Sequence, residues 1–66
     1  MNPDPIRWVA MKGSSSNEFQ VISGPWSRLQ SKDVPEQQGL GFETIAVVDS
    51  ESEAWKMIDL HRQRPH

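Results

Sequence analysis

The three tryptophans are the residues of this chain with the clearest capacity for recognition chemistry. Trp8, Trp26 and Trp55 occur among only 66 residues, a large share for a chain that is too short to build a large core. Indole rings contribute strongly at protein interfaces and also stack on nucleic-acid bases. This composition therefore indicates a binding function and leaves open whether the partner is a protein or a nucleic acid.

Residues that could support catalysis or hold a metal are few. The chain has no cysteine, which excludes a thiolate nucleophile and a thiolate metal site. Asp49, Glu51 and Glu53 lie together, but capping of a helix accounts for them. His61 is interpreted as an interface residue of the last helix. We expect no enzyme activity, no catalytic residue, no metal site and no cofactor.

Charge is unevenly distributed along the chain, whose net charge is −2. Residues 33–50 carry acidic side chains and no basic one: Asp33, Glu36, Glu43 and Asp49. The basic residues of the first half are separated: Arg7, Lys12, Arg28 and Lys32. A protein that binds nucleic acid through phosphates is expected to show a basic patch. The sequence shows none, although separated cations could converge in three dimensions, and the acidic segment favours a partner with a basic surface.

Three strands are expected to position these side chains. Alternation of apolar and polar residues predicts strands over residues 6–12 and 18–22, joined as a hairpin by a polar turn. The first strand is expected to bury one face. Residues 42–48 are nearly all β-branched or aromatic, which predicts a third strand in a central position, with Ser23-Gly24-Pro25 ending the second strand.

Two helices complete the prediction. A short helix is expected over residues 25–32, with Pro25 at its first position. Ser50 and Glu53 form the sequence pattern of a capping box, which predicts a long helix over residues 51–63. Its buried face is expected to consist of Ala54, Met57, Ile58 and His61, flanked by Trp55 and Leu60.

These elements predict an α+β fold, a small three-stranded antiparallel sheet packed by one short and one long helix in the order β-β-α-β-α, in two layers. Residues 1–66 are expected to form a single small domain, with a disordered lead-in (1–5), a mobile loop (33–41) and a tail (64–66). The longest apolar run, residues 45–48, is far too short to cross a bilayer. We expect a cytoplasmic protein without membrane contact.

Four short stretches also carry a family resemblance. They are Trp-Val-Ala-Met-Lys-Gly at 8–13, Trp26, Gly-Leu-Gly-Phe at 39–42 and Ser-Glu-Ser-Glu-Ala-Trp at 50–55. In this order of elements the chain resembles the hybrid-binding domain at the N-terminus of many eukaryotic ribonucleases H, a fold that is also similar to the N-terminal domain of a ribosomal protein. The resemblance spans residues 7–58.

This resemblance implies that Trp8 and Trp26 contact an RNA/DNA or RNA duplex. The family's basic residues on the third strand, which meet phosphates, are replaced here by Ala46 and Val47. Their loss removes cations that would hold a duplex. The same fold serves protein and ribosome contacts in other lineages, and those uses do not need the basic residues.

The sequence therefore predicts a non-catalytic module that binds another protein, and the alternative is binding of an RNA or RNA/DNA duplex. Trp55 is expected in the core. Trp8 can lie on either face of its strand, and Trp26 can be the anchor of its helix or an exposed contact. The candidate binding residues are Trp8, Trp26, Arg7, Lys12, Arg28 and Lys32.

Overall fold

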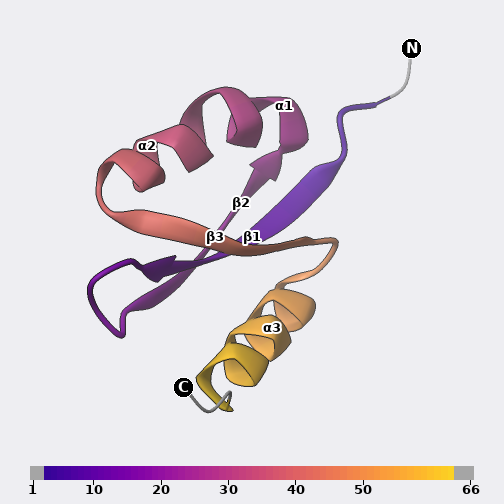
Figure 1. The fold of residues 1–66 in the computed structure, drawn as a ribbon. Coiled ribbons are helices and arrows are strands. Elements are labelled where there is room, and N and C mark those ends of the chain that lie inside the picture. The colour runs from indigo at the N-terminus through magenta and orange to yellow at the C-terminus, as the bar shows by residue number, and fades with distance from the viewer. Residues whose placement is uncertain (1–2, 64–66) are drawn as a thin grey trace.

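Three antiparallel strands form the centre of the fold (Figure 1). The computed structural model describes residues 3–63, so the predicted tail lies outside the described residues. The strands follow the order β2-β1-β3 across the sheet. Their bounds are β1 (Ile6–Gly13), β2 (Phe19–Pro25) and β3 (Phe42–Val48).

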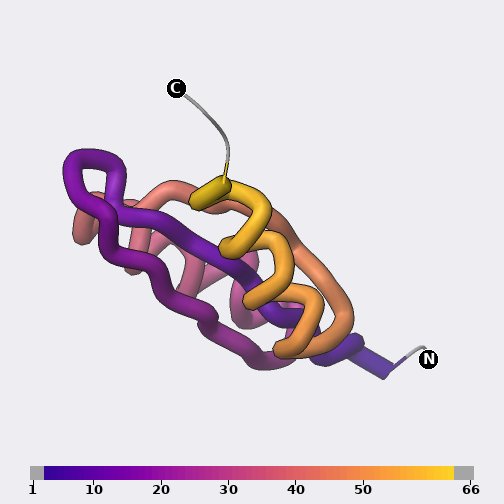
Figure 2. Tube along the Cα trace, turned by 90° about the horizontal axis from the view of Figure 1, so that it is seen from below, coloured from indigo at the N-terminus to yellow at the C-terminus, as the bar shows by residue number. Residues whose placement is uncertain are grey.

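Helices cover both faces of this sheet. One face carries three consecutive helical segments, which are α1 (Trp26–Arg28), η1 (Leu29–Asp33) and α2 (Val34–Gly39). The other face carries α3 (Glu51–Gln63), and Figure 2 shows this helix lying along the sheet. The predicted α+β class and element order are confirmed, but the fold has three layers where two were predicted.

The central strand is β1, because its side chains are apolar on both faces. Val9 and Met11 are fully buried beneath the α1–α2 layer, and Ala10 is fully buried beneath α3. The expectation that the first strand would bury only one face is therefore wrong. The central position predicted for residues 42–48 is also wrong, since β3 pairs with β1 alone within the described residues.

The second strand extends to Pro25, three residues beyond its predicted end at Ile22. Proline cannot donate a ladder hydrogen bond, but sheets tolerate it on edge strands, and β2 is an edge. Pro25 lies opposite Ile6 in the register. The amide of Trp26 then donates to the carbonyl of Pro5 at 2.8 Å, so strand pairing leads directly into α1.

Helical structure continues from Trp26 to Gly39, so the loop predicted over residues 33–41 is wrong for most of its length. A proline inside a regular α-helix lacks the N–H and clashes with the carbonyl four residues earlier. The π-helical segment η1 lies directly before this position, and Pro35 sits in the first turn of α2. The local change in hydrogen bonding lets the chain stay helical past a residue that normally ends a helix.

The π segment also aligns the apolar side chains of this layer. Leu29 and Val34 are five residues apart, which is the hydrogen-bond spacing of a π turn. In an uninterrupted α-helix they would be rotated about 140° from each other. Both pack in the cluster that contains Val9 and Met11. This pair does not follow the 3.6-residue period of an α-helix, so the pattern of the sequence does not show that the two side chains share a face.

A β-bulge makes the corresponding adjustment in β3. The register between β1 and β3 shifts by one residue between Ala10 and Met11. In an uninterrupted strand Ile45 and Val48 would lie on opposite faces, because their separation is odd. With the extra residue both pack on the α3 side, while Phe42 packs on the other side. The bulge thus places Val48 in the same core cluster as Ile45, on the opposite face from Phe42.

The long helix begins and ends where the sequence predicts. The amide of Glu53 donates to Ser50 Oγ at 3.3 Å. The Glu53 carboxylate accepts from the amide of Asp49, also at 3.3 Å, one residue before the amide expected in a capping box. Ala54 and Ile58 are fully buried against the sheet, as predicted.

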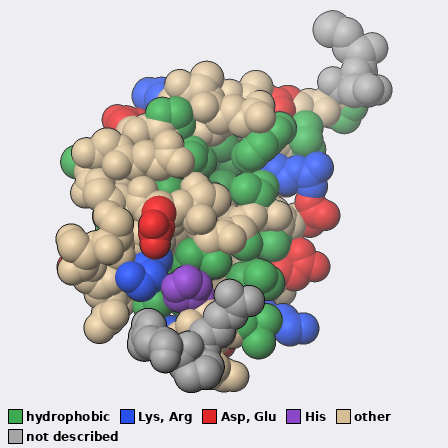
Figure 3. All heavy atoms as spheres, viewed as in Figure 1, with side chains coloured by type: hydrophobic (Ala, Val, Ile, Leu, Met, Phe, Trp, Pro, Cys, Tyr) green, Lys and Arg blue, Asp and Glu red, His purple; other side chains and the backbone are tan. Residues whose placement is uncertain are grey.

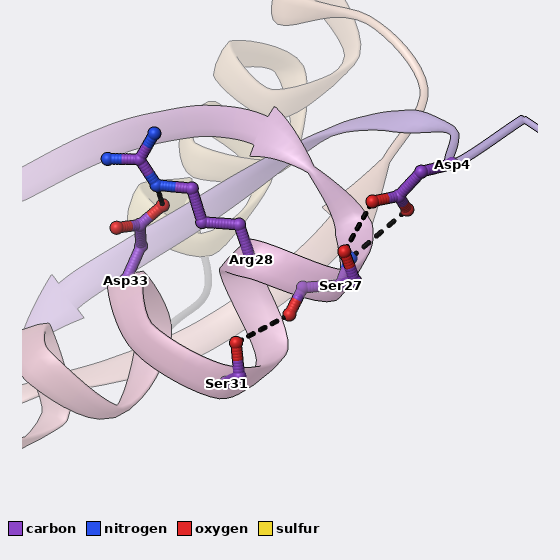
Figure 4. A network of polar contacts seen from close by, with 5 residues as sticks. All are labelled: Asp4, Ser27, Arg28, Ser31 and Asp33. Carbon is purple, nitrogen blue, oxygen red and sulfur yellow. Dashed lines mark hydrogen bonds and ion pairs between the residues drawn. The ribbon is translucent and has the colours of Figure 1, made fainter.

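The segment before β1 is attached to the start of α1. The Asp4 carboxylate accepts hydrogen bonds from the amide (3.2 Å) and the hydroxyl of Ser27 (Figure 4). Asp4 thereby satisfies one of the N–H groups that the first helical turn leaves unpaired. The lead-in predicted over residues 1–5 is thus joined to α1 through Asp4, and residues 1–2 lie outside the described residues.

We predict that Asp4→Ala lowers the free energy of unfolding by about 1 kcal/mol, because it removes the capping acceptor of α1. Urea denaturation followed by circular dichroism measures the change. Asp4→Asn is the matched control, since its amide oxygen can still accept from the Ser27 amide. Equal stability of Asp4→Ala and the unmodified chain would contradict a capping role.

Candidate functional site

The structure places the two candidate tryptophans on opposite faces of the sheet. Trp8 packs against the cluster beneath α3, which contains Ala10 and Ile58. Trp26 packs against the cluster on the other side, which contains Val9 and Leu29. Both indoles are half-buried. They therefore contribute to two separate core clusters and do not share one binding face.

Trp55 is the most exposed of the three tryptophans, with 42% of its surface accessible. The expectation that it lies in the core is wrong. Ala54 and Ile58 define the line along which α3 contacts the sheet, and Trp55 lies about 100° around the helix from Ala54. It stands at the border of the buried face rather than within it.

Two of the candidate basic residues are already engaged by carboxylates. Arg7 forms an ion pair with Asp49, which lies between β3 and α3. The Nε atom of Arg28 is 3.5 Å from Oδ2 of Asp33, within the α1–η1 helical segment (Figure 4). A guanidinium beside a carboxylate presents little net charge to a polyanion. Neither arginine is therefore well suited to grip a phosphate backbone.

The remaining candidate cations lie apart from these pairs and from each other. Lys12 is near the opposite end of β1 from Arg7, about 17 Å away at the usual rise of a strand. Its Nζ atom donates to the carbonyls of Gly13 (3.0 Å) and Ser16 (2.9 Å) in the hairpin turn. Lys32 is exposed on η1, in the other layer. The six candidate residues do not form one site.

The outer edge of β3 is the most accessible binding feature of the sheet. Edge strands expose a row of backbone N–H and C=O groups, and proteins commonly protect them with lysine or proline. β3 contains neither, whereas β2, the other edge, ends at Pro25. Val47 is 43% exposed. In Figure 3 hydrophobic side chains gather on the side of the molecule where β3 passes in front of β1.

Acidic charge accompanies this edge. Glu43 is exposed on β3 and Glu36 on α2, and neither has an ion-pair partner among residues 3–63. Asp33 and Asp49, by contrast, are neutralised by arginines. The acidic segment expected from the sequence therefore keeps its unneutralised charge on and just before β3.

A second feature, which sequence reasoning missed, is a hollow between the β1–β2 turn and the end of α3. It has a volume of about 310 Å³ and is lined by Lys12, Asn17, Phe19, His61 and Arg62. We call it the hairpin hollow. The Phe19 and His61 rings meet edge to face at 6.0 Å, and the Arg62 guanidinium carbon lies 4.8 Å from the Phe19 ring centre. The only sequence signal was basic residues in the last helical turn.

Within the described part of the chain, no group of side chains is arranged to hold a metal ion. No helix there has the length and apolarity that crossing a membrane requires. No family model, curated protein or solved structure matches the chain. The resemblance to the ribonuclease H hybrid-binding domain therefore stays a prediction.

Because Trp26 packs against a core cluster and Trp55 is exposed, replacing each with alanine is expected to change the free energy of unfolding by different amounts. We predict that Trp26→Ala lowers the free energy of unfolding by about 2 kcal/mol or more, because it removes apolar contacts with Val9 and Leu29. Trp55→Ala is expected to change it by less than about 1 kcal/mol. Urea titrations followed by circular dichroism test both. A larger loss for Trp55→Ala would show that the two roles are reversed.

Proposed function

We propose that this chain is a non-catalytic protein-interaction module that adds an extended, basic segment of a partner protein to the outer edge of β3. The observation that carries the proposal is the unpaired edge itself, which contains no lysine or proline and is interrupted by one bulge at Ile45. An added strand would satisfy its backbone groups and extend the sheet from three to four strands. The proposal needs no catalytic group and no cofactor.

The charge of the edge favours a basic partner. In an antiparallel sheet, side chains directly opposite each other on one face interact, and opposite charges stabilise the pair. Glu43 is exposed and without an ion-pair partner in the described chain, so a lysine or arginine across from it would gain such a contact. Exposed Val47, on the same strand, would pack against an apolar residue of the partner.

The disposition of the cations supports a protein partner over a nucleic-acid duplex. Arg7 and Arg28 lie on different elements, each is paired with a carboxylate, and the open edge is acidic. Affinity for a duplex comes largely from neutralising its phosphates with converging cations. The indoles of Trp8 and Trp26, which the family resemblance assigns to duplex contact, pack into different core clusters.

We predict that a peptide as long as β3, in which lysine and valine alternate, binds this edge, and that the same peptide with glutamate in place of lysine does not. Amide hydrogen exchange is the measurement, because a paired edge loses its outward-facing exchangeable amides. Protection is expected over residues 42–48 and not over residues 19–25.

Glu43→Lys is expected to reverse the preference between the two peptides, since it reverses the charge on the edge. Glu18→Lys is the matched control, because Glu18 is exposed and precedes the other edge strand. Protection of β2 instead of β3 would overturn the proposal. So would pairing of two copies of the chain through β3, detected by sedimentation, since the edge would then be occupied by a second copy.

A duplex titration separates the proposal from nucleic-acid binding. We predict that a short RNA/DNA duplex binds weakly at about 50 mM salt and not measurably at about 200 mM, because few unpaired cations face one surface. Fluorescence anisotropy of a labelled duplex measures this. Tight binding with a steep dependence on salt would contradict the proposed function and favour the duplex.

A further inference from the structure

The hairpin hollow gathers cationic groups at the end of the molecule where β1 and β2 turn. Its lining includes Lys12 and Arg62 together with His61, and no acidic residue. A volume of about 310 Å³ is at the lower limit for sites that hold small molecules. The cationic side chains and the small volume of the hollow both limit which ligands it could hold.

Both cations are held in place by contacts within the chain. The Lys12 ammonium has three N–H donors, and two of them are taken by the carbonyls of Gly13 and Ser16. The Arg62 guanidinium lies over the Phe19 ring at 4.8 Å. Its NH1 atom is 3.6 Å from the Asp59 carboxylate, but both side chains are more than half exposed (55% and 63%), so water screens this pair more than the pair of Arg28 with Asp33, whose side chain is 24% exposed. Fixed donors lose little conformational entropy on binding a ligand, which favours a specific site.

Donors remain after these internal contacts are counted. Lys12 keeps one N–H, and Arg62 keeps most of the five N–H groups of its planar fork. The amide of Asn17 and the imidazole of His61 add further donors to the lining. Glu43 is the neighbouring residue to Lys12 on β3, but no ion pair joins them. Lys12 is thus not neutralised in the way that Arg7 and Arg28 are.

We propose that the hairpin hollow binds the phosphate group of a small phosphorylated molecule. An arginine fork matches the geometry of phosphate oxygens, and a lysine ammonium adds a point charge. Phe19 supplies the apolar part of the lining, against which the rest of a small ligand can pack. The site uses side chains of β1, β2, the turn between them and the last turn of α3, and it borders the peptide site at Lys12, which lies opposite Glu43.

Titration with inorganic phosphate and with O-phosphoserine, followed by amide NMR at constant ionic strength, tests the site. We expect saturable shifts at Asn17, Phe19 and His61, and no such shifts with serine. Arg62→Gln is expected to weaken phosphate binding about tenfold or more, because charged hydrogen bonds are lost. Arg28→Gln is the matched control, since Arg28 lies on the other face of the sheet.

Lys12→Gln is a second variant and is expected to weaken binding, but it also removes bonds that order the hairpin turn. Arg62→Gln is therefore the decisive variant, because Arg62 is exposed in the last turn of α3 and its replacement is not expected to disturb the fold. Shifts that do not saturate would overturn the proposal. Equal binding by Arg62→Gln and the unmodified chain would overturn it too, as would tighter binding of a phosphoserine peptide than of O-phosphoserine.

Discussion

The burial of β1 on both of its faces is the constraint on which the rest of this structure depends. Val9, Ala10 and Met11 are consecutive and fully buried, and successive side chains of a strand point to opposite faces. Such a strand needs a strand on each side and a covering layer above and below. In this chain of 66 residues, every other described element serves to cover β1: two edge strands, one interrupted helix and one continuous helix.

Two local irregularities let so few elements cover both faces. The π segment brings Leu29 and Val34 to the same core cluster, and the bulge in β3 brings Ile45 and Val48 to the other. Each departs from the regular period of its element because apolar side chains must meet a fixed partner surface. The packing of the sheet and, in the helical layer, Pro35 together account for where these departures occur.

Because most elements contribute side chains to the core, few side chains remain free to bind a partner. Trp8 and Trp26 pack against the two core clusters. Arg7 and Arg28 form ion pairs with neighbouring carboxylates. What remains accessible is an edge strand with acidic charge and a hollow with basic charge, and they lie on different elements. The surface is therefore better described as two small sites of opposite sign than as one aromatic patch.

Elements with local signals can be read from the amino-acid sequence: the α+β class, the strand at 42–48 and the helix at 51–63 with its capping residues. Hydrogen bonds between near neighbours, such as Glu53 to Ser50, are encoded within a few residues. Strand order, the helix past Pro35, the face of each tryptophan and the placement of Lys12 and Arg62 around one hollow follow only from the folded arrangement. These depend on contacts between residues far apart in the chain, and no local period records them.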